Sequence, residues 1–153
     1  MERIPSFSVN HNKLQKGMYI SRIDATDIVT YDIRMKLPNG GDYLSTGGMH
    51  TFEHLFATFA RNSEYKAHII YFGPMGCRTG FYLITRSLPH ANAIRLVAEG
   101  CNFTASFDGD IPGASAIECG NYQDQNLPEA NALGAEMTDV LQNWTEDMMQ
   151  YVL

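Results

Sequence analysis

Hydrophobic and polar residues alternate strictly over residues 27–37, and a period of two is typical of a half-buried antiparallel β-strand. One face of this strand carries Val29, Tyr31, Ile33, Met35 and Leu37, and the other carries Ile28, Thr30, Asp32, Arg34 and Lys36. We expect the polar face to point toward water or toward a site. Short apolar stretches at 16–22, 67–72 and 80–86 predict three further strands.

A period near 3.6 residues predicts helices in three other stretches of the chain. The first is capped by Ser45 or Thr46 and runs to about Asn62, and the second covers about 89–105. The third begins after Asn126, a residue type that favours helix starts. Together these elements predict an α+β fold, with an antiparallel sheet of about four strands and helices packed on one face.

The first predicted helix has two chemically different sides. Its apolar stripe consists of Met49, Phe52, Leu55, Phe56 and Phe59, and the opposite side carries His50, Glu53, His54, Ala57 and Arg61. Residues four apart lie on one face of a helix about a turn apart, so the two histidines can chelate one metal ion. Glu53 is on the same side, where it can move protons at whatever the metal binds. The motif HTFEH therefore predicts a metal site, although a solvated polar face is the simpler alternative for the pentapeptide alone.

A catalytic metal usually takes three protein ligands and keeps one position open, so the function depends on the third ligand. Cys119 would complete a His, His, Cys set that suits zinc or iron(II). Glu118 and Glu129 compete with it. Glu129 serves equally well as a capping residue three positions after Asn126, and we favour that role.

The composition restricts the classes of protein that this chain can represent. Its 153 residues are most simply one domain, residues 1–153, and 44% hydrophobic with 18% charged residues is a globular composition. A net charge of −6 with scattered basic residues argues against nucleic acid as a partner. We also expect no membrane association, because apolar runs stay below the roughly 18 residues of a membrane span. Three widely spaced cysteines and the absence of a signal-peptide core near Met1 favour a reduced, cytoplasmic compartment.

Two of the cysteines invite opposite interpretations. Cys77 lies between glycines and beside Arg78, where a guanidinium would favour the reactive thiolate, although a small buried residue is the alternative. Cys101 lies among apolar residues of the second predicted helix and is expected in the core. Five other polar residues carry little signal individually: Ser6, His11, Arg34, His68 and His90.

Five motifs, taken together and in order, resemble one family closely. They are SFSVNHN at 6–12, YDIRMKLPN at 31–39, HTFEH at 50–54, GPMGCRTG at 73–80 and ECGNY at 118–122. This combination resembles S-ribosylhomocysteine lyase, the LuxS family, over nearly the whole chain. That family makes the precursor of autoinducer-2 in bacteria and is a homodimer whose active sites lie at the subunit interface.

The resemblance implies a role for each of the motif residues. His50, His54 and Cys119 are similar to the family's metal ligands, with iron(II) as the expected metal and zinc or cobalt also accommodated. Two residues, Glu53 and Cys77, correspond to its acid/base groups. Three more correspond to substrate-binding or proton-positioning residues: Ser6, His11 and Arg34.

The implied reaction explains these residue types. A thioether leaves readily only when a carbonyl stands two carbons away, so the sugar carbonyl must migrate from C1 to C3 before homocysteine is eliminated. A Lewis-acidic metal stabilises the enediolates, and the proton transfers need groups poised near neutral pH. The products are homocysteine and 4,5-dihydroxy-2,3-pentanedione.

Two positions depart from the family pattern. Tyr71 stands six residues before Cys77, where the family commonly has an aspartate associated with the substrate pocket, and Asn10 stands where aspartate is usual. We expect retained activity with weakened or altered substrate affinity. Two other functions stay open: a small peptidase of the inverzincin type with Glu53 as base, and a non-enzymatic domain whose structural zinc is closed by four protein ligands.

Overall fold

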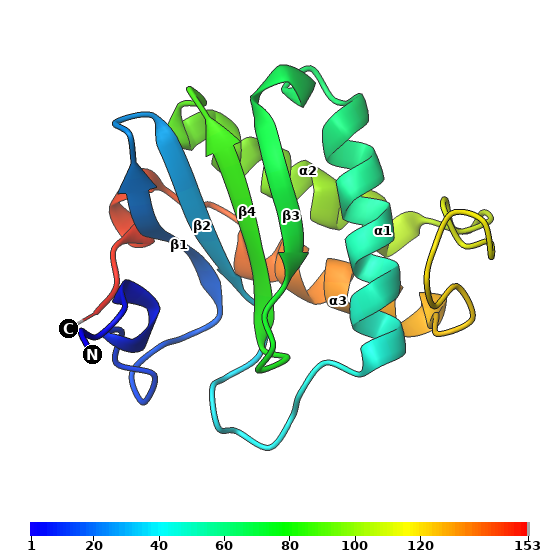
Figure 1. Ribbon diagram of the computed structural model, residues 1–153, viewed down its shortest axis with the longest axis horizontal. Helices are drawn as coiled ribbons and strands as arrows, with labels where there is room; N and C mark the ends of the chain where they lie inside the picture. Colours follow the sequence, from blue (N-terminus) through cyan, green and yellow to red (C-terminus); the bar gives the residue numbers. More distant parts are fainter. Residues whose placement is uncertain (153) are drawn as a thin grey trace.

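The computed structural model of this protein describes residues 1–152 and has an antiparallel sheet with helices on one face (Figure 1). The strands are β1 (Gly17–Asp24), β2 (Ile28–Arg34), β3 (Ile69–Pro74) and β4 (Gly80–Arg86), in the order β1-β2-β4-β3. The helices are α1 (Thr46–Asn62), α2 (His90–Ser106) and α3 (Leu127–Val140), with short 3-10 turns η1 (Pro5–Phe7), η2 (Lys66–His68) and η3 (Glu146–Met149). The predicted α+β fold of about four strands is confirmed. Among the described helices, none combines the length and the apolar character needed to cross a bilayer.

The core lies between the sheet and the helices and follows the alternation of the strands. On β2, Val29, Tyr31 and Ile33 are buried, and Phe81 and Leu83 continue this layer on β4. Four phenylalanine rings from α1, β3 and β4 meet with centroids 4.2 to 6.2 Å apart: Phe52, Phe56, Phe72 and Phe81. The apolar stripe of α1 therefore meets the sheet as its helical period predicts.

The end of β2 differs from the sequence prediction. The strand ends at Arg34, and Leu37 is exposed although the alternation placed it on the buried face. The backbone N–H groups of Met35 and Lys36 both donate to the carbonyl of Thr79, at 2.9 and 3.0 Å. This shared acceptor breaks the ladder and turns the chain away before residue 37.

The polar face of β2 is buried, even though it points away from the helices. Thr30, Asp32 and Arg34 are only 9%, 1% and 3% exposed. Both chain termini lie on the β1 side of the sheet (Figure 1). Tyr151 covers part of this face, since its hydroxyl reaches the Asp32 carboxylate. These three polar side chains of β2 are therefore shielded from water by neighbouring parts of the chain.

The starts of α1 and α3 are joined to one another. Ser45 caps α1 by accepting from the N–H of Gly48 at 3.0 Å, and Asn126 caps α3 by accepting from the N–H of Glu129 at 3.1 Å. The Glu129 carboxylate in turn accepts from the backbone N–H and the hydroxyl of Ser45. Helix α1, which carries the histidines, is therefore held at its first turn by α3.

Candidate metal centre and active site

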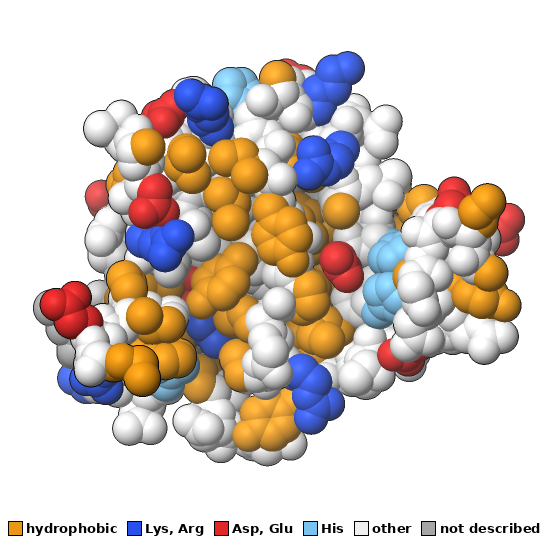
Figure 2. All heavy atoms as spheres, viewed as in Figure 1, with side chains coloured by type: hydrophobic (Ala, Val, Ile, Leu, Met, Phe, Trp, Pro, Cys, Tyr) orange, Lys and Arg blue, Asp and Glu red, His pale blue; other side chains and the backbone are white. Residues whose placement is uncertain are grey.

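Three side chains from two distant parts of the chain form a group that can hold a metal ion. The ligand atoms of His50, His54 and Cys119 all lie within 4.8 Å of one another. The histidine rings on α1 are 4.5 Å apart, and the Cys119 Sγ is 3.3 Å from His50 Nε2. Cys119 belongs to the segment between α2 and α3, which projects from the body of the molecule (Figure 1). Figure 2 shows histidine and acidic side chains together at the base of this projection.

Backbone carbonyls orient both histidines toward the shared position. His50 Nδ1 lies 2.8 Å from the carbonyl oxygen of Asp124, and His54 Nδ1 lies 2.8 Å from that of Pro112. A carbonyl only accepts, so both Nδ1 atoms carry the proton and both Nε2 atoms keep a free lone pair. This arrangement is the usual one for metal-binding imidazoles, and the three residues therefore fit a divalent metal.

The two carboxylates that compete as third ligand have other partners. Glu118 accepts from the hydroxyl of Ser115 at 2.6 Å. Glu129 is bonded to Ser45, in agreement with its expected place at the start of α3. Cys119 is the residue that joins the two histidines in the described structure. Three ligands leave a fourth coordination position for water or substrate, as in catalytic sites.

Thr51 fastens the projecting segment to the histidine helix. Its side chain is fully buried, and its hydroxyl donates to Gln125 Oε1 at 2.7 Å while accepting from the N–H of Asn126 at 2.9 Å. With the carbonyl of Pro112 bonded to His54, the segment is tied to α1 near both of its ends. Cys119 is positioned through these ties rather than by regular secondary structure.

Cys77 lies in the turn between β3 and β4, and this turn is bound to the start of α1. The turn is closed by hydrogen bonds from Arg78 N to Met75 O and from Met75 N to Gly80 O. Arg78 takes a left-handed backbone conformation, with φ of 58°. The N–H of Leu44, just before α1, donates to the carbonyl of Arg78 at 2.9 Å. The exposed thiol is thus held at the same end of the molecule as the first turns of α1.

The guanidinium nearest to Cys77 belongs to Arg34. Arg34 Nη1 lies 4.0 Å from the Cys77 Sγ and donates to Thr79 Oγ1 at 2.7 Å, and that hydroxyl is 3.0 Å from the same sulfur. Burial works against the charge of Arg34, but the Asp32 carboxylate outweighs it and holds the pKa of the guanidinium above its usual value. The neighbouring Arg78 instead donates to the carbonyl of Leu44. The positively charged neighbour that was expected for Cys77 is therefore Arg34 on β2 and not Arg78.

The remaining predicted site residues fall in different places. Glu53 lies half-buried on α1, directly before His54. Ser6 belongs to η1, which contacts β1, whereas α1 contacts β3 at the opposite edge of the sheet. His11 lies in the loop between η1 and β1, with its Nδ1 2.9 Å from the carbonyl of Val9. Among the described residues, neither Ser6 nor His11 is a member of the metal-binding group.

The residues expected to be structural have structural partners. Cys101 is fully buried in α2, and burial raises the pKa of its thiol to about 12. His90 Nδ1 lies 2.8 Å from the Tyr31 hydroxyl, and His68 Nδ1 lies 2.9 Å from the carbonyl of Arg86. None of these three belongs to the metal-binding group.

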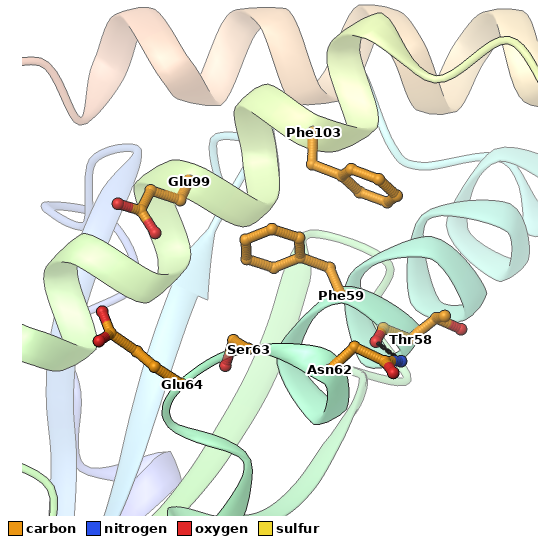
Figure 3. A pocket seen from close by; sticks show the side chains of 7 residues that line it. All are labelled: Thr58, Phe59, Asn62, Ser63, Glu64, Glu99 and Phe103. Carbon is orange, nitrogen blue, oxygen red and sulfur yellow. Dashed lines mark hydrogen bonds between the residues drawn. The ribbon is translucent and has the colours of Figure 1, made fainter.

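A hollow of about 470 Å³ between α1 and α2 is separate from this chemistry (Figure 3). The rings of Phe59 and Phe103 form its floor, and Glu64 and Glu99 stand at its edge. Arg95 pairs with both carboxylates, so their charge is already balanced within the chain. Its lining contains no histidine or cysteine.

Three residues that support the site were not predicted from the sequence: Thr51, Thr79 and Asp32. Asp32 had a signal, since it precedes Arg34 by two positions and two residues share a strand face at that spacing. A single threonine inside a predicted helix, such as Thr51, carries no comparable signal. Its partners are more than seventy positions away, where sequence periodicity gives no information.

The fold and this site define an α+β protein with a His, His, Cys group that can hold a metal ion and with an exposed thiol, Cys77, in the turn bound to the start of the histidine helix. A family model described as S-ribosylhomocysteinase (LuxS) matches residues 4–148. An S-ribosylhomocysteine lyase of Clostridium acetobutylicum is 49% identical over 99% of both chains, and one of Clostridium beijerinckii is 48% identical over the same shares. One of Phocaeicola vulgatus is 41% identical, over 99% of this chain and 98% of its own. The chain belongs to the S-ribosylhomocysteinase (LuxS) family.

Proposed function

We propose that this chain cleaves S-ribosylhomocysteine to homocysteine and 4,5-dihydroxy-2,3-pentanedione, the precursor of autoinducer-2, as a single lyase domain of residues 1–153. Family membership makes it a carbon–sulfur lyase. The observation that carries the proposal is the His50, His54, Cys119 group, built on the helix whose start is joined to the Cys77 turn.

His50, His54 and Cys119 are the residues that would hold the metal, which we propose to be iron(II), with zinc or cobalt as substitutes. When bound, the metal supplies a Lewis acid that stabilises negative charge on the sugar oxygens during carbonyl migration. The two histidines offer Nε2 lone pairs because backbone carbonyls hold their Nδ1 protons. The thiolate adds a softer ligand with negative charge, which suits iron(II) or zinc.

Glu53 and Cys77 are proposed to carry the protons. Each carbonyl migration removes a proton from one carbon and returns a proton to its neighbour, so the acid/base groups must alternate between protonated and deprotonated forms. In the final step a proton leaves C4, the C4–C5 double bond forms, and the C5–sulfur bond breaks with the electron pair leaving on homocysteine. The guanidinium of Arg34, 4.0 Å from the Cys77 sulfur, is the cationic group beside this thiol.

The substrate-binding residues support a homodimer with interfacial active sites. Ser6 and His11 lie on the β1 side of the sheet, while the metal-binding helix packs near β3. We propose that a second copy supplies Ser6 and His11 to the site that holds Arg34, Cys77 and the metal. We also propose that the enzyme works in the cytoplasm and has neither nucleic acid nor membrane as a partner, in keeping with its net charge of −6.

Tyr71 is the departure that bears most directly on substrate affinity. It is half-exposed on β3 and lines a hollow of about 340 Å³ with Ser6 and Tyr82. A phenol in place of a carboxylate cannot pair ionically with an amino group on the substrate, so we propose weakened or altered recognition of the homocysteine end. The second departure, Asn10, lies near the N-terminus and removes a negative charge that the family pattern has at this position. A Tyr71→Asp protein that binds the substrate no more tightly would show that the change is already compensated.

The test is anaerobic incubation of the iron- or cobalt-loaded protein with S-ribosylhomocysteine, following homocysteine with a thiol reagent. Cys77→Ala and Glu53→Gln proteins are run alongside, and the metal content of each is measured. We expect release by the parent and loss in both variants with metal retained. No release by a metal-loaded dimer would refute the proposed substrate.

The same preparations test the two other functions. A peptidase would cleave a peptide library and would lose that activity on Glu129→Ala but not on Cys119→Ala. A structural zinc would show four protein ligands and no exchangeable water in metal spectroscopy, whereas the proposed lyase centre keeps one position open.

A further inference from the structure

The polar face of β2 holds an ion pair that is almost completely removed from water. Asp32 and Arg34 are 1% and 3% exposed, and they bond through two contacts, Nε to Oδ1 at 3.1 Å and Nη2 to Oδ2 at 2.6 Å. A buried ion pair is costly unless its remaining donors and acceptors are also satisfied. The geometry of this pair is therefore determined by the groups that complete it.

On the Arg34 side, the pair is completed by the Cys77 turn. Nη1, the guanidinium nitrogen that Asp32 does not use, donates to Thr79 Oγ1 at 2.7 Å and lies 4.0 Å from the Cys77 Sγ. The position of this nitrogen follows from the Asp32 contacts, because two parallel bonds leave a planar guanidinium little freedom to rotate. The carboxylate therefore aims Arg34 at the thiol.

On the Asp32 side, the pair is completed by a residue near the other end of the chain. The Tyr151 hydroxyl donates to Asp32 Oδ2 at 2.7 Å, the same oxygen that accepts from Arg34 Nη2. The Tyr151 ring stacks on Tyr19, with centroids 5.2 Å apart and planes at 23°. Burial and the Asp32 carboxylate raise the pKa of this phenol, so it stays a neutral donor throughout the physiological pH range.

We propose that Tyr151 and Asp32 are positioning residues that hold the Arg34 guanidinium beside Cys77 and set how much of its positive charge reaches the thiol. The proposal rests on the proposed function only in giving Cys77 a part in catalysis. By sharing Oδ2, the Tyr151 hydroxyl takes up part of the carboxylate charge, so Asp32 neutralises the guanidinium less completely. Two residues 119 positions apart thus act on one reactive sulfur through Arg34.

The other ionisable groups around Cys77 do not replace this arrangement. Arg78 directs its side chain to the carbonyl of Leu44 and over the ring of Tyr43, 5.9 Å from the centroid. Tyr82, opposite Asp32 on β4, has its pKa raised by burial and by the Asp32 carboxylate, and so remains neutral. Arg34 is the charged group through which the environment of the thiol is adjusted.

The test measures the rate of Cys77 alkylation by iodoacetamide as a function of pH in the cobalt-loaded protein, with mass spectrometry reporting Cys77 separately from Cys119. For Tyr151→Phe we expect alkylation at pH 7 to slow on the order of three- to tenfold, with the profile displaced to higher pH. For Asp32→Asn we expect the profile to move to lower pH, because the guanidinium loses its counter-charge. Tyr65→Phe, at a residue of the hydrophobic core cluster, should behave as the parent.

Homocysteine release is followed in the same proteins. For Tyr151→Phe we expect kcat to fall by a factor similar to that for alkylation while KM changes less than about twofold. Unchanged alkylation in both Tyr151→Phe and Asp32→Asn would overturn the proposal. Displacement of both pH profiles in the same direction, with lowered melting temperatures, would also overturn it, because it would indicate a general loss of stability. If the alkylation profiles of the two variants are displaced but the parent itself releases no homocysteine, the positioning role is supported and the lyase assignment is refuted instead.

Discussion

Replacing Thr51 with valine tests whether the projecting segment is held on α1 by two hydrogen bonds. Valine keeps the shape of the side chain but removes the hydroxyl that bonds Gln125 and the N–H of Asn126, at 2.7 and 2.9 Å. A buried polar group left without a partner costs about 1–3 kcal/mol. We therefore expect the free energy of unfolding of the metal-free protein to fall by about 2 kcal/mol, the middle of that range.

The same change should weaken metal binding, because Cys119 is carried by the segment that Thr51 fastens. Loss of an outer-shell partner typically lowers metal affinity about 10- to 100-fold, and we expect the lower end because Thr51 does not contact a ligand directly. The assay is titration of the cobalt-loaded protein with a competing chelator, following the absorbance of the bound ion. Urea unfolding of the metal-free protein gives the stability term separately.

Two variants control this experiment. Thr51→Ser keeps the hydroxyl and should retain most of the metal affinity. Thr58→Val makes the same chemical change two turns further along α1, at an exposed position, and should alter neither quantity. Cobalt affinity within twofold of the parent in Thr51→Val would refute the inference that these hydrogen bonds position Cys119.

Three further predictions concern the fold. Gly134→Ala should destabilise the protein by about 1–3 kcal/mol in urea unfolding, because the added methyl group would stand 2.6 Å from the carbonyl oxygen of Cys101. Gly120→Ala, with open space around its Cβ position, should not change the stability. Equal stabilities of the two variants would contradict the close approach of α2 and α3. Burial raises the pKa of Tyr31 to about 12, so the stability its neutral hydroxyl contributes is complete below pH 10 and is lost as the pH rises through 12. In Tyr31→Phe, the fall in the free energy of unfolding between pH 9 and 12 should be smaller than in the parent by about 3 kcal/mol. The same pH dependence in both proteins would disprove this prediction. Ser45→Ala removes the cap of α1 and should cost about 1 kcal/mol in the same assay, with Ser45→Thr close to the parent.

The elements of the fold could be predicted because the signals that specify them are local. The helix predicted to be capped by Ser45 or Thr46 and to run to about Asn62 is present as α1, with Ser45 as its cap, and its histidines share a face because residues four apart do so in a helix. The strand boundaries were less predictable. β2 ends three residues before Leu37 because the N–H groups of the next two residues, Met35 and Lys36, both bond the carbonyl of Thr79, a partner that alternation in the sequence cannot identify.

The candidate site divides in the same way. Residues 50–54 by themselves give two ligands and a carboxylate on one helical face, and the five motifs in order indicate the family to which the chain belongs. Residue spacing by itself left Glu118 and Glu129 as competitors of Cys119, and the family resemblance favoured Cys119. The tertiary structure shows the reason, because it brings this thiol to the two histidines and gives both carboxylates other partners.

The surroundings of Cys77 were decided by tertiary structure alone. Sequence adjacency favoured Arg78 as its cationic neighbour, but the left-handed backbone at that residue turns the side chain toward Leu44. Arg34 takes the place because β2 and β4 pair with Arg34 opposite Gly80, next to the turn that carries the thiol. Local periodicity thus determined which residues share a face, whereas strand register and chain packing determined which faces meet, since those depend on contacts between residues far apart in the chain.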